Sequence, residues 1–338
     1  MSGDGARHEH GEDATMSQNQ SAAGALRRPR MTGLTGLVLS IALAVSAALP
    51  SAGAAAVAQR TFSSPEQAAE ALAAAWRSGD KSEVLAIFGS AADKLVNSGD
   101  VVAEKAARER LASSYDEAHR LDLEGADKAV IVLGKDEWPY PIPLLKQGAG
   151  WRFDVKAGAE QIIDRRIGRN ELNAIAVCRA YVEAQREYAG KDRLGDGLRQ
   201  YAQRVASTEG KHDGLFWRTP EGGEESPLGP LVVAAEAQGY RAASAEGRAP
   251  FHGYFYRILT RQGQSAPGGA RDYLANGHLT GGFALVAFPA TYGDSGVMTF
   301  IVSQDGIVFE KNLGPNTADV ARRIAAYDPD ATWRVAQP

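Results

Sequence analysis

The chain has a single cysteine and no surplus of basic residues. Cys178 is the only thiol among 338 residues, so the chain cannot form an internal disulfide. Lysine and arginine number 37 and aspartate and glutamate number 41, which gives a formal net charge of −4 at pH 7. Proteins that bind nucleic acid through its phosphates generally carry a basic surplus. We therefore expect no nucleic-acid partner.

Long apolar runs are missing beyond the N-terminal region, which excludes a protein with several membrane spans. The composition is 44% hydrophobic and 23% charged, as in globular rather than disordered or fibrous proteins. Ile175, Cys178, Tyr181 and Val182 recur at helical spacing. This pattern predicts that Cys178 is a small buried apolar side chain, and a reactive thiol is the less favoured alternative.

The N-terminal region has the layout of a secretory signal. Arginines 27, 28 and 30 precede an uncharged apolar run at 34–49, which is followed by an alanine-rich stretch. The run is shorter than the roughly 20 residues that cross a bilayer, so cleavage is favoured over anchoring. We expect the cut before Gln59, with a cut after Ala56 as the alternative. No cysteine follows the run to carry a lipid anchor.

The signal sequence and the hydrophobic patterns divide the chain into three segments. Residues 1–58 are predicted to be an N-terminal extension and cleavable signal peptide, 61–158 a first domain and 159–338 a second. The mature protein is expected to be periplasmic or secreted, with no transmembrane anchor after cleavage. Export through the twin-arginine route is less favoured, because Pro29, Arg30 and Met31 follow the arginine pair instead of apolar residues.

The first domain is predicted to be α+β, with helices first and an antiparallel sheet after them. Ser63, Pro65 and Glu66 predict a helix start, with Ser63 and Glu66 forming a capping box. A Ser-Gly-Asp break at 78–80 separates this helix from a second, and a third is expected at 104–119. The period then changes to that of strands, which are expected at 130–133, 142–145 and 151–155.

This order resembles the nuclear transport factor 2-like cone, in which helices cover a curved sheet. Members of that class often enclose a pocket. The resemblance implies that Trp138, Tyr140 and Trp151 line a cavity here. The acid–base pair that enzymatic members need is not visible, and His119 is the only histidine of the segment.

The second domain is also predicted to be α+β, with one long helix packed on an antiparallel meander. The helix is expected at 159–188, and Gly168 is a position where it could bend or split. An amphipathic segment at 228–237 interrupts a long polar stretch. Asp305 and Gly306 predict a hairpin turn between two strands. The four strands are expected at 251–260, 282–288, 297–303 and 307–310. A closing helix is expected at 318–327.

Several segments together resemble the bacterial domain-of-unknown-function 2950 family. They are GRNEL (168–172), CRAY (178–181), YAQ (201–203), KHDGLFW (211–217), SPLGP (226–230), GVMTFIV (296–302), and WP and PIP at 138–143. The resemblance covers nearly the whole mature chain. It implies an exported envelope protein without an established activity.

The layout of the second domain also resembles the globular part of the major pseudopilins of type II secretion. A pilin helix is apolar throughout its N-terminal half, whereas this one carries Asp164, Arg165, Arg166, Arg169 and Asn170 there. The comparison therefore implies a soluble recognition module and not a filament subunit.

One glycine-rich segment has part of a calcium-loop pattern. Asp192, Asp196 and Gly197 occupy the first, fifth and sixth positions of such a loop. Leu194 and glutamines stand where other oxygen ligands are needed, so a plain turn is favoured over calcium. No other cofactor is expected. His212, Asp213 and His278 lack partners at zinc-ligand spacings.

A Gly-Asp-Ser-Gly tetrapeptide at 293–296 matches the sequence around a chymotrypsin-type nucleophile. His252 with Asp272 or Asp294 could complete a triad with Ser295. The residues that usually surround the catalytic serine and histidine of such enzymes are absent. Glycine, aspartate and serine are common in turns between strands, so a turn is favoured.

Aromatic residues gather in the second domain around Trp217 and Tyr240. Because alternate strand residues face opposite sides, either His252, Tyr254 and Tyr256 or Phe251 and Phe255 could form an exposed contact face. Together with the resemblance, this favours a non-enzymatic binding or assembly module for an unknown envelope protein. The alternative is a small-molecule binder or enzyme that uses a pocket in the first domain.

Overall fold

The computed structural model describes residues 58–220, 222–241 and 249–337. All of them belong to one of the two units into which contacts divide the chain, residues 54–338. The predicted signal peptide, apart from Ala58, lies outside the described residues. No helix in the described part of the chain is long and apolar enough to span a membrane. The fold is mixed α+β, as expected from the sequence.

The first helices begin close to the expected positions. The helix α1 (Pro65–Ser78) has Ser64 as its N-cap, one residue later than expected, since Pro65 is already helical and the Ser64 hydroxyl accepts from the Gln67 amide at 3.3 Å. Gly79 ends α1 in the left-handed conformation, with φ of 73°. Next come α2 (Lys81–Phe88), a 3₁₀ turn (Ser90–Ala92), α3 (Asp93–Val96) and α4 (Val101–Glu117).

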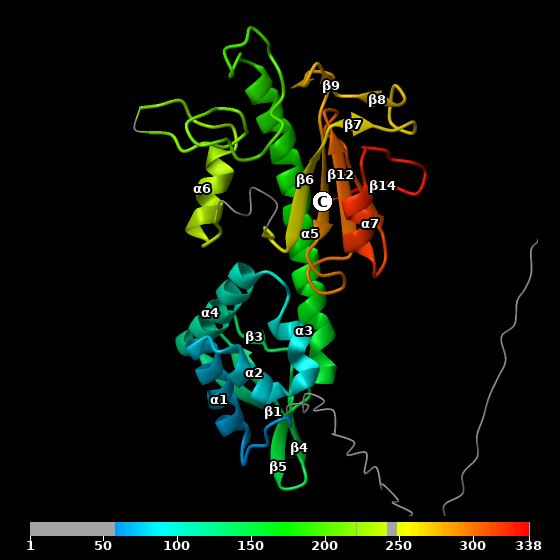
Figure 1. Cartoon of the computed structure of the whole chain (residues 1–338). Coiled ribbons are helices and arrows are strands. Elements are labelled where there is room, and N and C mark those ends of the chain that lie inside the picture. Colours follow the sequence, from blue (N-terminus) through cyan, green and yellow to red (C-terminus); the bar gives the residue numbers. More distant parts are fainter. Residues whose placement is uncertain (1–57, 221, 242–248, 338) are drawn as a thin grey trace, which may run out of the picture. The chain divides into compact units, whose positions relative to one another are not determined.

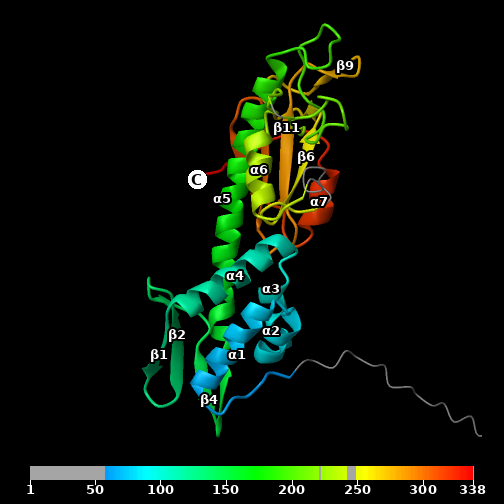
Figure 2. The same ribbon diagram turned by 90° about the vertical axis from the view of Figure 1, so that its left-hand side faces the viewer.

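An antiparallel sheet follows these helices. Its strands are β1 (His119–Glu124), β2 (Lys128–Leu133), β3 (Trp138–Pro139), β4 (Leu144–Gln147) and β5 (Gly150–Phe153), in the order β1-β2-β4-β5 with β3 also paired to β2. Figure 2 shows the first four helices beside strands β1, β2 and β4. Strand β1 was not expected, because it is an edge strand whose residues are almost all exposed. The strand expected at 142–145 begins two residues later.

A first hydrophobic cluster lies between these helices and the sheet. Trp76 of α1 packs edge-on against Tyr140, with ring centroids 5.3 Å apart. Phe88 of α2 packs in the same way on Phe153 of β5, at 5.1 Å. Leu72, Ile131, Ile142 and Leu144 are fully buried in this cluster.

The long helix α5 (Val155–Ala189) belongs to both hydrophobic clusters of the described residues. It begins four residues earlier than expected, where the Asp154 carboxylate accepts from the Ala157 amide at 3.2 Å. Gly168 neither bends nor splits it, and α5 is continuous through this position. Its first turns pack against the cluster described above, and its stripe from Ala174 to Tyr188 packs against a second sheet (Figure 1).

The second sheet is the expected antiparallel meander with one strand added. Its strands are β6 (Tyr254–Leu259), β11 (Ala284–Pro289), β12 (Met298–Ser303), β13 (Val308–Asn312) and β14 (Arg334–Val335), in the order β14-β13-β12-β11-β6. The turn at Asp305 and Gly306 joins β12 to β13 as predicted, and Gly306 has φ of 77°. In the sequence, four short strands come between β6 and β11 and form two further two-stranded sheets: β7 (Arg261–Gln262) with β8 (Arg271–Asp272), and β9 (Leu274–Ala275) with β10 (His278–Leu279).

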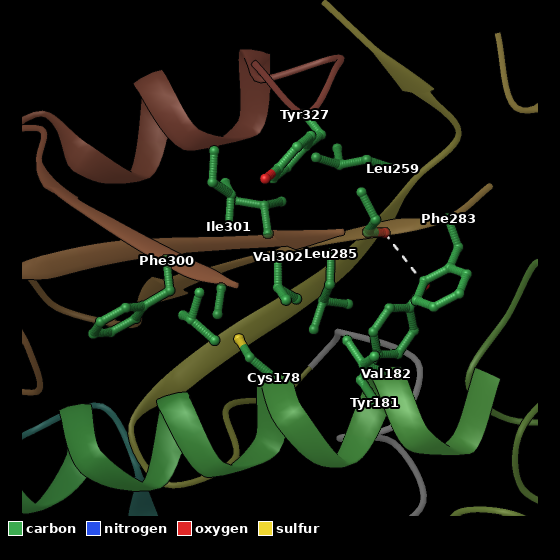
Figure 3. Packing of buried hydrophobic residues seen from close by; sticks show 14 of the residues in the cluster. Cys178, Tyr181, Val182, Leu259, Phe283, Leu285, Phe300, Ile301, Val302 and Tyr327 are labelled. Atoms are coloured by element: carbon green, nitrogen blue, oxygen red, sulfur yellow. Dashed lines mark hydrogen bonds between the residues drawn. The ribbon is translucent and has the colours of Figure 1, made fainter. Parts of the chain in front are cut away.

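Helix α6 (Gly229–Ala237) precedes the sheet, and α7 (Thr317–Arg323) packs on β11. Helix α7 ends four residues before the predicted end at Tyr327, because that side chain is almost fully buried and its backbone bridges to Gln262. Figure 3 shows Cys178 of α5 directed at the sheet and Tyr327 on the opposite side of it. Cys178 is fully buried, as predicted, and burial raises the pKa of its thiol to about 12.

Two glycines of α5 give a matched test of its packing. A methyl group on Gly158 would collide with the backbone of Pro141, whereas nothing lies within 4 Å of the same position at Gly168. Gly158→Ala should therefore destabilise the protein by about 1–3 kcal/mol through overpacking. Gly168→Ala should stabilise it by roughly 0.5–1 kcal/mol, because alanine is the better helix former. Urea unfolding measures both changes, and equal effects would contradict the close approach at Gly158.

Candidate functional site

A cavity of about 590 Å³ lies beside α4 and α5. Its volume falls within the roughly 300–1,000 Å³ of typical small-molecule sites. Apolar side chains from α1 to α5 form much of its wall, and Ser98, Tyr140, Gln238, Tyr240 and His252 also line it. The main apolar residues are Trp76, Phe88, Leu95, Val102, Leu111 and Ile162.

Four arginines also line this cavity. Arg108 and Arg110 come from α4, and Arg166 and Arg169 come from α5. Among the described residues, no carboxylate oxygen lies within 4.0 Å of any of their nitrogens. The Nε atom of Arg108 is buried without a hydrogen-bond partner in the described structure. The arginines therefore give this wall a positive charge that the described side chains do not neutralise by direct pairing.

The two arginines of α5 differ in how they are held. Arg166 donates to the carbonyl oxygens of Lys94 and Leu95, at 2.9 and 2.7 Å, and burial lowers its pKa. Arg169 lies at the exposed rim, where partial desolvation and the neighbouring Arg110 lower its pKa. Arg166 thus joins α5 to α3, while Arg169 keeps its guanidinium available to the cavity.

Both acidic residues of the cavity wall already have cationic partners. Glu104 is buried; this raises its pKa, but an ion pair with Lys81 and hydrogen bonds from Ser98 outweigh burial and leave the pKa lowered. The backbone amides of Ser98 and Gly99 donate to it at 2.6 and 3.1 Å. Glu109 pairs with Lys105 at 3.4 Å. Neither carboxylate forms an ion pair with an arginine of the wall, although the charge of Glu104 opposes the lowering of the Arg166 pKa.

Asp100 joins the start of α4 to Tyr240 and Gly253. Its carboxylate caps α4 by accepting from the Ala103 amide at 3.0 Å. The same carboxylate accepts from the Tyr240 hydroxyl at 2.9 Å and the Gly253 amide at 2.8 Å. Tyr240 in turn accepts from the His252 amide at 3.3 Å, and burial followed by the Asp100 charge raises the Tyr240 pKa. One buried acid therefore holds three segments together.

His252 combines partial burial with an unusual backbone. Its φ is 50°, a region that non-glycine residues seldom adopt. Burial lowers the pKa of its imidazole, which favours the neutral ring. As a wall residue it offers a hydrogen-bonding ring to the cavity.

Of the three aromatic residues expected in a first-domain pocket, only Tyr140 lines this cavity. Trp138 is partly buried, lies 6.0 Å from the Tyr140 ring and faces a separate pocket of about 270 Å³. Trp151 is 8% exposed and sits in β5, where its backbone bridges to Phe62. The structure thus brings Trp138 and Tyr140 together and leaves Trp151 in the hydrophobic cluster.

The aromatic residues of the second half are mostly packed inside. Tyr254 is fully buried and donates to the Met298 carbonyl at 2.9 Å. Tyr256 lines an apolar pocket of about 80 Å³ beside α6. Phe251 is buried, while His252 and Phe255 are half-buried, so neither of the two proposed sets forms an exposed face.

Trp217 is buried by neighbours from its own loop region. It stacks on His212 with ring centroids 4.2 Å apart, and its indole donates to the Glu224 carbonyl at 3.0 Å. The guanidinium of Arg193 lies 5.3 Å from its ring centroid. These contacts give Trp217 a structural role in the polar stretch before α6.

The carboxylates of the calcium-like loop hold the loop's own backbone. Asp192 accepts from the amides of Gly195, Asp196 and Gly197 at 2.8–3.3 Å. Asp196 accepts from the Leu198 amide and the Gln200 side chain. Among the described residues, no group of three or more His, Cys, Asp or Glu side chains could hold a metal ion. The geometry is that of the glycine-rich turn.

Ser295 lies in a turn and is fully buried. Its hydroxyl donates to the Thr291 carbonyl at 3.1 Å and accepts from the Thr291 amide at 2.9 Å. These bonds occupy the hydroxyl and match the turn interpretation of the tetrapeptide.

Sequence reasoning missed the arginines and Asp100 as site residues. In the sequence, Arg166 and Arg169 served only to distinguish this helix from a pilin helix, although their spacing of three residues places them on one side of it. That shared face was the available signal. Nothing in the sequence indicated that α4 would supply two more arginines opposite it.

The joining role of Asp100 can be tested by comparison with an aspartate that only caps a helix. Asp100→Ala should destabilise the protein by about 3 kcal/mol, because it removes a cap and leaves two buried donors without their acceptor. Tyr240→Phe should cost about 1 kcal/mol. Asp80→Ala, which removes only the exposed cap of α2, should lower the stability clearly less than Asp100→Ala does. Chemical unfolding measures all three, and similar values for Asp100→Ala and Asp80→Ala would refute the joining role.

Comparison with known proteins adds a family but no activity. No curated protein and no solved structure matches the chain. The family model described as "Protein of unknown function (DUF2950)" matches residues 59–336, nearly all of the described chain. This confirms the resemblance carried by the segments at 138–143 and from 168 onward. The chain belongs to the DUF2950 family.

Proposed function

We propose that the protein is a non-enzymatic binding module of the cell envelope that holds a small molecule in the cavity beside α4 and α5. The observation that carries this proposal is the cavity itself, with about 590 Å³ of space, apolar walls and a few polar groups. Sites of this composition are typical of small-molecule binding.

The wall is fixed by contacts that need no ligand. Arg166 holds the end of α3 through two carbonyl oxygens, and Asp100 holds Tyr240 and Gly253. A cavity that is already formed binds without the free-energy cost of ordering its walls. This favours binding in the existing cavity.

The reactive side chains considered above also favour binding over catalysis. The Ser295 hydroxyl is committed to Thr291, and the Cys178 thiol is buried with a raised pKa. A nucleophile needs an accessible, activated group beside a base. Neither side chain meets that requirement.

The cone-like and pseudopilin-like descriptions remain part of this proposal. Helices α1 to α4 beside the β1-β2-β4-β5 sheet support the first, and α5 on the β6-β11-β12-β13 meander supports the second. In this proposal α5 joins a ligand-binding half to a recognition half that docks another envelope component.

The envelope location rests on the sequence of residues 1–58. Expression in an exporting bacterium should yield a soluble protein outside the cytoplasm that begins at Gln59, because the apolar run is followed by small residues that suit cleavage. N-terminal sequencing and fractionation check this. Recovery of only the intact chain from the cytoplasm would refute the location without affecting the cavity.

A bulky side chain in the wall tests the cavity. Uncharged anilinonaphthalene, which fluoresces in apolar surroundings, should bind the wild-type protein. Ala107→Trp on α4 should weaken this binding by at least about tenfold, since the indole occupies the space that the probe needs. Ser113→Trp on the exposed side of α4 is the matched control and should bind as the wild type does. No binding to the wild type, or equal binding to Ala107→Trp, would overturn the proposal.

A further inference from the structure

We propose that the ligand of this cavity is an organic anion with an apolar body, whose anionic group is held by Arg108, Arg110 and Arg169. The inference rests on the proposed function and deepens it by naming the ligand's chemistry. It depends on the arrangement of charge in the wall and not on the presence of the cavity alone.

The arginines reach the cavity from two helices. Arg169 projects from α5 one turn after Arg166, so the two share a face of the helix. Arg108 and Arg110 come from α4. Arg110 and Arg169 line the same cavity, and partial desolvation followed by the charge of Arg110 lowers the pKa of Arg169. Arginine side chains from both helices therefore line the same cavity.

Such an arrangement is unfavourable without a counterion. The described carboxylates of the wall, Glu104 and Glu109, are paired with lysines instead. The Arg108 Nε atom is buried and donates to nothing in the described structure. A buried polar group without a partner destabilises the fold, and Arg110 and Arg169, which are both exposed, add repulsion between like charges at the rim. An anion bound here would remove both penalties.

Arginine also specifies the chemical class of the anionic group. The planar guanidinium presents a fork of N–H donors that fits carboxylate, sulfonate and phosphate oxygens. Two or more guanidinium groups can share one such group. A neutral hydrogen-bonding ligand would leave their charges uncompensated.

The rest of the wall specifies the body of the ligand. Trp76, Phe88, Leu95, Val102 and Ile162 present hydrocarbon and aromatic surface to the same cavity. Inorganic phosphate would leave most of this surface in contact with water. A molecule with an apolar portion and one anionic group uses both parts of the wall.

Two probes that differ by one charged group test the inference. Anilinonaphthalene sulfonate carries an anionic group that uncharged anilinonaphthalene lacks, and both have the same apolar rings. The variant is Arg108→Gln with Arg169→Gln, which leaves Arg166 and its structural hydrogen bonds intact. Arg179→Gln, an exposed arginine elsewhere on α5, is the matched control.

The sulfonate probe should lose at least about tenfold in affinity in the double variant, since hydrogen bonds to charged groups are worth that much or more. The uncharged probe should change by less than about twofold, well under the 1.4 kcal/mol of a tenfold change. Arg179→Gln should change neither. The melting temperature of the ligand-free double variant should equal or exceed that of the wild type, because repulsion is removed. A purely structural role for these arginines would lower it.

The outcomes separate the two proposals. If both probes bind the wild type and the double variant weakens neither, or weakens both equally, the anion inference is overturned and the cavity remains a binding site. If neither probe binds the wild type, the proposed function fails as well. Loss of the sulfonate probe alone supports the inference.

Discussion

The packing of α5 against two hydrophobic clusters is the constraint on which the rest of the structure depends. A helix that serves one cluster needs a single apolar stripe along its length. Here the stripe from Ala174 to Tyr188 is complete and faces the meander. The preceding turns carry Arg166, Arg169 and Asn170 and must still pack against other parts of the chain. The polar half of α5 therefore has to be accommodated in a partly buried position.

The structure accommodates each of these polar groups differently. Arg166 uses the free carbonyl oxygens at the end of α3, and Asn170 donates to the Ser295 carbonyl at 2.9 Å. Both bonds satisfy a donor without introducing a negative charge. Arg169 donates to no such carbonyl oxygen in the described structure and lies at the cavity rim. The cavity thus lies beside the polar part of α5.

The sequence predicted the elements whose periodicity is strong and missed those that depend on distant contacts. The four strands of the meander, the Asp305–Gly306 turn and the burial of Cys178 follow from local pattern, and all are confirmed. Strand β1 was missed because an edge strand buries little. Helix α7 was predicted too long because Tyr327 fits a helical stripe but packs on the far side of the sheet. The cavity could not be predicted, since it needs the distance between α4 and α5.

The use of the acidic residues explains why the cavity keeps its positive charge. Asp100 and Glu104 are both buried and lie near α4, where either could have neutralised an arginine. Asp100 instead accepts from Tyr240 and Gly253, and Glu104 accepts from Lys81, Ser98 and Gly99. A carboxylate satisfied in this way has little remaining capacity for a guanidinium. Asp100 and Glu104 thus stabilise the walls, and the arginines remain available to a ligand that enters the cavity. Fold stability and ligand recognition therefore depend on different charged groups.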